Sequence, residues 1–131
     1  MPTLFTRIID RELPAAFVWE DDRCVAFMAK DAARAGHVLV VPREEVDHWP
    51  DADVDLLTHL LRTCRTIASA QQAAFPSERV ALLVLGLEVP HLHLHLIPID
   101  GMGDVDFARA RRDVPLDELE ANAEAIRGRL P

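Results

Sequence analysis

The stretch HLHLHLIP at residues 91–98 constrains the fold more than any other, because histidine and leucine alternate strictly over its first six positions. Side chains of a β-strand point alternately to opposite faces of the sheet. The stretch is therefore predicted to be a strand whose two faces differ in chemistry, with neighbouring histidines about 6.6 Å apart at roughly 3.3 Å per residue. One face carries His91, His93 and His95, and the other sends Leu92, Leu94 and Leu96 into the core.

The remaining hydrophobic pattern predicts an α+β domain. Apolar residues at helical spacing predict three helices, over 4–13, 52–75 and 115–130. Pro14 is expected to end the first helix, and Asp51 is expected to be the N-cap of the second. Short apolar or β-branched runs predict further strands. These strands are 16–21, 24–29, 37–42 and 80–86, of which the last two are apolar throughout and expected to be buried.

Length and charge restrict the class of protein. A chain of 131 residues is expected to form one domain. Its formal net charge of −8 disfavours binding to nucleic acid or to an anionic membrane. No leader or membrane-length apolar run is visible, so a cytoplasmic protein is expected. Cys24 and Cys64 form no CxxC motif and are expected to be small core residues.

Three interpretations of the histidine row are open. Two histidines at i and i+2 can share a zinc ion, with nitrogens about 2.1 Å from the metal, but three on one straight strand hardly can. A solvent-facing strand could use histidine as a generic polar residue, although only six histidines occur in the chain. A row of imidazoles could also donate hydrogen bonds to a phosphoryl group, while a neutral imidazole attacks the phosphorus.

Three motifs, at consistent spacing over residues 4–98, resemble the histidine-triad (HIT) superfamily and its Hint-type branch. They are HLHLHLI at 91–97, FTRIIDRELPAAFVWEDDRCVAF at 5–27 and GHVLVVP at 36–42. The resemblance implies a HIT-like fold, a five-stranded antiparallel sheet with a long helix packed on it and a C-terminal helix. It also implies one HIT domain over 1–131, with the triad-containing core at about 4–98 and a C-terminal extension at 99–131.

The resemblance also implies a reaction. The family hydrolyses a nucleoside monophosphate from a substituent on its α-phosphate, either a phosphoramidate or a dinucleoside polyphosphate, through a nucleotidyl-histidine and without metal or cofactor. His93 would be the nucleophile, His91 would orient it, His95 would contact the phosphate and the leaving group, and His37 would be the fourth histidine. The small-molecule nucleotide would lie against Phe5, Ile8 and Phe27, with Leu39 near the sugar and Glu88 and Val89 at the phosphate loop. A homodimer through the 52–75 helix is expected.

Several positions depart from the family pattern. Ala29 stands where an aspartate usually holds the ribose hydroxyls, and Asp31 comes two positions late. Leu87 replaces a glutamine, and Glu88 occupies a place where a small polar phosphate contact is common. A carboxylate there would repel a phosphate unless it points away or is protonated. We therefore expect the nucleophile to be intact and the grip on the substrate to be altered.

Two other functions are compatible with these departures. One is a non-catalytic nucleotide-binding or dimeric interaction protein, and the other is a metal-binding module that uses two triad histidines. Outside the motifs, His48 and His59 are expected on the surface. The segment 101–112 is expected to be a packed connection rather than a lid, and its Arg109, Arg111 and Arg112 a solvated cluster.

Overall fold

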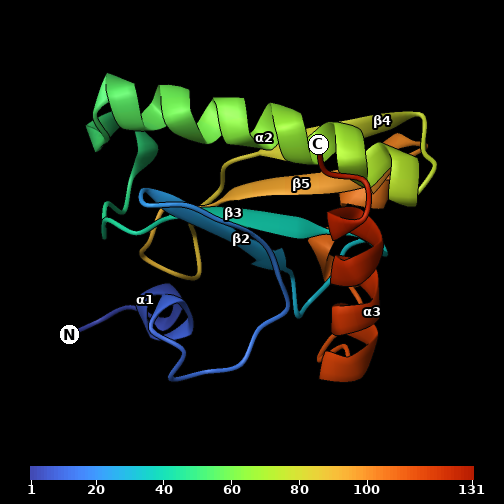
Figure 1. Ribbon diagram of the computed structural model, residues 1–131, viewed down its shortest axis with the longest axis horizontal. Coiled ribbons are helices and arrows are strands. Elements are labelled where there is room, and N and C mark those ends of the chain that lie inside the picture. Colours follow the sequence, from blue (N-terminus) through green and yellow to red (C-terminus); the bar gives the residue numbers. More distant parts are fainter.

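Five antiparallel strands form one sheet in the order β1-β2-β3-β5-β4 in the computed structural model, which describes all 131 residues (Figure 1). Each strand coincides with an apolar or alternating run of the sequence, so the predicted α+β class is confirmed. The strands are β1 (Phe17–Glu20), β2 (Cys24–Met28), β3 (Val38–Pro42), β4 (Arg79–Leu83) and β5 (Leu94–Ile99).

Helices cover both sides of this sheet (Figure 1). The long helix α2 (Val54–Ala74) runs along one face, and the short helix α1 (Leu4–Ile9) lies on the opposite side. The C-terminal helix α3 (Leu116–Arg127) packs against α2, β1 and β2. None of the helices combines the length with the apolar character that a bilayer crossing would need.

Three element boundaries differ from the prediction. The first helix ends at Ile9 instead of residue 13, because Arg11 adopts a positive φ of 65° that an α-helix cannot contain. Residues Trp49–Asp51 form a 3-10 turn, so α2 begins after Asp53 rather than after Asp51. The strand predicted over 91–98 is hydrogen-bonded as β5 only from Leu94, and the two preceding histidines lie on its approach.

The strand predicted over 80–86 is not buried. It is β4, the outermost strand beside β5, and only some of its side chains are partly covered. An edge strand has a neighbour on one side only, so an apolar composition alone did not indicate its exposure. The run at 37–42, by contrast, is buried at every position of β3, as predicted.

The two faces of the sheet bury separate apolar clusters. The larger cluster, here called the helix face, packs the sheet against α2 and α3 and contains Leu92, Leu94 and Leu96, as predicted. Both cysteines also belong to it, which agrees with their expected role in the core. The smaller cluster, here called the pocket face, lies on the side of α1 and consists of Phe5, Ile9, Val25, Phe27, Ala29, Leu39 and Val41.

A close contact fixes the chain just before β3. Gly36 has a φ of +88°, and a Cβ built on it would lie 2.8 Å from the Phe75 ring. The buried side chain of Gln71 donates hydrogen bonds to the carbonyl oxygens of Gly36 and Leu96, at 2.6 and 2.8 Å. Since His37 follows Gly36 directly, this contact between the end of α2 and the sheet sets where His37 begins.

Candidate active site

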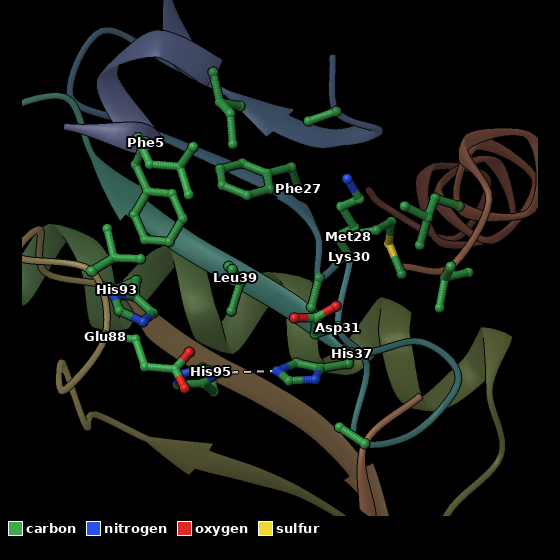
Figure 2. Close-up of a pocket in the computed structure, with 18 of the residues that line it drawn as sticks. Phe5, Phe27, Met28, Lys30, Asp31, His37, Leu39, Glu88, His93 and His95 are labelled. Carbon is green, nitrogen blue, oxygen red and sulfur yellow. Dashed lines mark hydrogen bonds between the residues drawn. The ribbon is translucent and has the colours of Figure 1, made fainter. Parts of the chain in front are cut away.

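A cavity of about 910 Å³ opens on the pocket face and contains three of the four predicted histidines in its lining (Figure 2). His37, His93 and His95 line it, while His91 lies fully buried behind it. His95 sits on β5 directly opposite Leu39 of β3, and His37 precedes β3. Antiparallel pairing of β3 with β5 therefore brings together histidines that are 58 positions apart in the sequence.

His91 fastens the triad to the surrounding structure. Its Nε2–H donates to the carbonyl oxygen of Pro42 at 2.7 Å, so its Nδ1 is left as an acceptor. The hydroxyl of Thr3, the N-cap of α1, donates to this Nδ1 at 2.6 Å. Glu45 accepts in turn from the backbone N–H of Thr3 at 2.9 Å, and so holds the start of α1 in place.

Hydrogen bonding also assigns the proton on His93. Its Nδ1 lies 2.7 Å from the carbonyl oxygen of His91, which can only accept, so Nδ1 carries the proton. In the neutral ring the lone pair is then on Nε2, and no protein atom hydrogen-bonds to that nitrogen. His91 thus orients His93 through its backbone carbonyl rather than through its imidazole.

A short chain of hydrogen bonds, here called the relay, holds His95 in the opposite tautomer. The backbone N–H of Ala33 donates to Nδ1 of His37 at 3.0 Å, which places the His37 proton on Nε2. That Nε2–H donates to Nδ1 of His95 at 3.0 Å, so the proton of neutral His95 is on its own Nε2 (Figure 2). His95 therefore presents a hydrogen-bond donor to the cavity, whereas His93 presents a lone pair.

Burial keeps these imidazoles uncharged. Desolvation, together with a smaller effect of neighbouring histidines, lowers the pKa of His37 to about 3 and that of His95 to about 4. Burial also lowers the pKa of His91 and of His93, although hydrogen bonds to backbone carbonyls oppose the shift. All four rings are therefore neutral at pH 7, as a nitrogen nucleophile must be.

The structure brings together the apolar residues that the sequence assigned to the base and sugar. Phe5 and Phe27 meet edge to face with ring centroids 5.6 Å apart, and Phe5 stands 4.9 Å from the His93 ring. Ile8, Leu39 and Val89 line the same cavity. A flat ring can lie among such side chains, while polar groups at the cavity floor fix its orientation.

The C-terminal segment forms a wall of the cavity that the sequence analysis did not find. Phe107 packs edge to face against His95 and His37, at ring-centroid distances of 5.1 and 5.9 Å. Further apolar lining comes from Ala110, Val114, Pro115, Leu116 and Leu119. The spaced apolar residues of this segment could have indicated a wall of the cavity, but the three family motifs from which the site was predicted end before the segment begins.

Salt bridges and backbone pairing make this segment the packed connection that was expected. Arg111 pairs with Ala32 through its backbone and with Glu118 through its guanidinium. Arg109 is exposed, and Arg112 donates to Asp31 at 3.1 Å. The three arginines thus lie on the surface, as predicted, and none hydrogen-bonds to a triad histidine.

The position that usually grips the ribose has no free carboxylate. Ala29 lines the cavity but offers only a methyl group. Asp31, the nearest acid, accepts from the Arg112 guanidinium at 3.1 Å and from the backbone N–H of Asp113 at 3.0 Å. It is therefore engaged in holding the C-terminal segment.

Glu88 does not point away from the histidines. It lies in the loop between β4 and β5 and lines the cavity together with His93 and His95. In Figure 2 its carboxylate lies on the side of His93 away from Phe5 and Phe27. A negative charge therefore stands beside the place where a phosphate would be attacked.

Potential metal ligands gather elsewhere. One group of three side chains has ligand atoms within 4.8 Å of one another, and it consists of Asp21, Cys24 and His59. Burial raises the pKa of the Cys24 thiol to about 12, so it is protonated at neutral pH. His59, expected on the surface, is half-buried and bonds to Asp21 at 2.8 Å, whereas His48 is exposed as predicted.

Comparison with known proteins gives consistent results. The HIT domain model matches residues 10–102. A HIT-like protein of Methanocaldococcus jannaschii is 31% identical over 121 residues, which cover 88% of this chain and 94% of that protein. The structure of a HIT-like protein from Bartonella henselae aligns with a TM-score of 0.87 and 30% identity, over 98% of this chain and 96% of the other. The structure of a hypothetical histidine triad nucleotide-binding protein from Sulfolobus tokodaii aligns with a TM-score of 0.84 and 28% identity, over 95% of this chain and 89% of the other.

Proposed function

The chain belongs to the HIT domain family, which supports a nucleotide-binding hydrolase or transferase in general, and from this premise we propose that it cleaves nucleoside phosphoramidates or dinucleoside polyphosphates through a nucleotidyl-His93 intermediate. The observation that carries the proposal is the pair of opposite tautomers. His93 offers a lone pair and His95 a donor to the same cavity.

In the first step Nε2 of His93 attacks the α-phosphorus. A bond forms between Nε2 and phosphorus, and the bond from phosphorus to the leaving nitrogen or oxygen breaks. The departing atom takes its proton from solvent, and Nδ1 keeps the proton that it donates to the His91 carbonyl. The Nε2–H of His95 donates to a phosphoryl oxygen, where negative charge is concentrated in the transition state.

In the second step water replaces the histidine. The water oxygen bonds to phosphorus, and the bond from phosphorus to Nε2 breaks. The water proton passes to solvent, so His93 returns to its neutral form and the nucleoside monophosphate leaves. The nucleoside monophosphate and the released leaving group together equal the substrate plus one molecule of water.

Substrate grip is expected to come mainly from stacking and from the phosphate. Phe5, Phe27 and Leu39 provide apolar area for a base and sugar, but Ala29 provides no acceptor for ribose hydroxyls. Losing such hydrogen bonds weakens binding by about 0.5–1.5 kcal/mol each. We therefore expect weak discrimination between ribose and deoxyribose.

Single-turnover release of mononucleotide tests the proposal. Purine phosphoramidates and diadenosine polyphosphates are mixed with excess protein, and free mononucleotide and a nucleotidyl mass adduct are followed. Release should require His93, and His93→Ala should reduce it by roughly 10³-fold or more, since the nucleophile is lost. His48→Ala, a change at an exposed histidine outside the cavity, is the matched control.

The same experiment identifies a purely binding protein. Ala29 favours that alternative because it removes the family's carboxylate contact to the ribose, and the nearby Asp31 is engaged with Arg112. Nucleotide bound without His93-dependent release, over the whole panel, would contradict the proposed hydrolysis.

We also propose a homodimer through α2 and the neighbouring edge strand β4. The outer edge of β4 has no partner in the sheet, and α2 packs beside it. Exposed apolar side chains gather on these elements and on the loop that follows, at Leu61, Leu82, Val84 and Leu85. Light scattering at micromolar concentration should give twice the mass of one chain, and the Leu61→Glu variant should give the mass of a single chain.

A further inference from the structure

One charged side chain of the cavity lining has no partner of opposite charge. Lys30 lies 3.4 Å from Asp113, and Arg112 lies 3.1 Å from Asp31. Glu88 is the remaining charged side chain of the lining, and it forms no ion pair and no hydrogen bond with the protein. The cavity thus carries one uncompensated negative charge, in a chain whose net charge is already −8.

This charge lies close enough to His93 to oppose the effect of burial on that ring. Burial lowers the pKa of His93, and among the opposing influences is the negative charge of Glu88. Figure 2 places the Glu88 carboxylate on the far side of His93 from Phe5 and Phe27. A nucleoside that stacks on the two phenylalanines therefore leaves the Glu88 side for the other substituent of the α-phosphate.

We propose that the leaving group is cationic and that Glu88 selects it, and this inference rests on the proposed nucleotidyl transfer. The substrate would be a nucleoside phosphoramidate whose amine carries a second amino group that is protonated at pH 7, as in a diamine or a basic amino acid. Glu88 contacts this ammonium group and is a specificity-determining residue, while His93 performs the attack.

The same charge excludes the other leaving group that the family reaction allows. The departing group of a dinucleoside polyphosphate carries several negative charges, which Glu88 repels. The lining offers no free cation to offset them, because Lys30 and Arg112 are already paired with carboxylates. An amine leaving group has no such conflict, since it takes up a proton and becomes more positive as the bond from phosphorus to nitrogen breaks.

Three adenosine phosphoramidates of similar size separate charge from shape. Their amines are 1,3-diaminopropane, with a terminal ammonium group, propylamine, which is neutral, and β-alanine, with a terminal carboxylate. The wild-type ratio of kcat/KM for the cationic over the anionic substrate should be about tenfold or more, which equals about 1.4 kcal/mol. High salt should reduce this ratio, because exposed charges are screened.

Variants at two exposed glutamates give the decisive comparison. Glu88→Gln should bring the ratio close to one, and Glu88→Lys should invert it. Glu124→Gln, at an exposed position of α3 outside the cavity, should keep the wild-type ratio. An unchanged ratio in Glu88→Gln would overturn the inference, even where His93-dependent release upholds the proposed reaction.

Failure of the reaction itself has a different signature. Release that is absent from all three substrates, or is equal in wild type and His93→Ala, overturns the proposed function and removes the premise of the inference. Faster His93-dependent release from diadenosine polyphosphates than from the diaminopropane substrate overturns the inference alone.

Discussion

The helix face and the pocket face of this sheet are built by the same strands and differ in what they leave uncovered. On β5, Leu94 and Leu96 enter the larger core, while His95 between them enters the cavity. On β3, Val38 and Val40 join the larger core, and Leu39 joins the cavity wall. Alternation along a strand thus assigns stability and chemistry to neighbouring residues.

Hydrogen bonding shows the same division. The large core is apolar apart from isolated groups such as Gln71, whose amide nitrogen joins two backbone carbonyls. The histidines of the other face bond mainly to backbone groups and to each other, and this leaves one nitrogen free on His93 and one on His95. Changes on the first face should therefore affect folding, and changes on the second should affect turnover.

The largest effect on stability is expected from Leu96→Ala. Leu96 is 2% exposed, and truncation leaves a closed cavity that costs about 3 kcal/mol of unfolding free energy. His95→Ala, one position away, opens onto space that solvent already reaches and should cost less than half of that. Urea unfolding measures both, and kcat should fall strongly only in His95→Ala. Equal losses of stability would contradict the division between the faces.

Gly36→Ala tests the close contact between the end of α2 and the residue that precedes His37, and it should affect both stability and turnover. The positive φ and the Phe75 ring 2.8 Å from the new Cβ should together cost about 2 kcal/mol. Because His37 follows, the relay to His95 should also be displaced and turnover reduced. Gly101→Ala is the matched control, since Gly101 has an extended backbone and nothing within 4 Å of its Cβ position. Thermal unfolding and kcat should show no change in the control.

Acid should destabilise the pocket face before the helix face. The pKa of His95 is lowered to about 4 in the folded chain, so the unfolded state binds the proton first, at its ordinary value of about 6.5. Its contribution to stability is complete above pH 6.5 and is lost as the pH falls through about 4. Between pH 7 and 5 this amounts to about 2 kcal/mol.

His95→Gln isolates that contribution. Glutamine does not titrate, so the loss of unfolding free energy between pH 7 and 5 should be about 2 kcal/mol smaller than in wild type. His48→Gln, outside the cavity, should keep the wild-type loss. Identical pH profiles for wild type and His95→Gln would show that His95 takes up its proton as readily in the folded chain as in the unfolded one.

The smallest effect is expected from Thr3→Ala. The Thr3 hydroxyl accepts from the backbone N–H of Thr6 as the N-cap of α1 and donates to His91. Its removal should cost about 1 kcal/mol and modestly lower kcat, because His91 carries the carbonyl that orients His93. Thr3→Ser keeps the hydroxyl and should restore both quantities; failure to do so would mean that the methyl group matters instead.

Alternation and motif spacing were sufficient to predict much of this molecule. The five strands and the long helix follow from local periodicity, whereas the convergence of His37 with His95 was implied by the family resemblance and results from the pairing of β3 with β5. The engagement of Asp31 with Arg112 was not predictable, because it joins residues 81 positions apart through a loop without periodicity. The exposure of β4 was missed for a similar reason, since sheet order is a property of the whole chain.

The cavity walls have a consequence for how such a chain can diversify. The matched family segment, 10–102, contains all four histidines, whereas Phe5 and Ile8 precede it and the wall from Phe107 to Leu119 follows it. Substitutions at Phe5, at Ile8 or along the wall from Phe107 to Leu119 reshape what the cavity admits, whereas the hydrogen bonds that set the tautomers of His93 and His95 come from residues within 10–102. Related proteins can therefore keep the same arrangement of histidines and admit different molecules through changes outside residues 10–102.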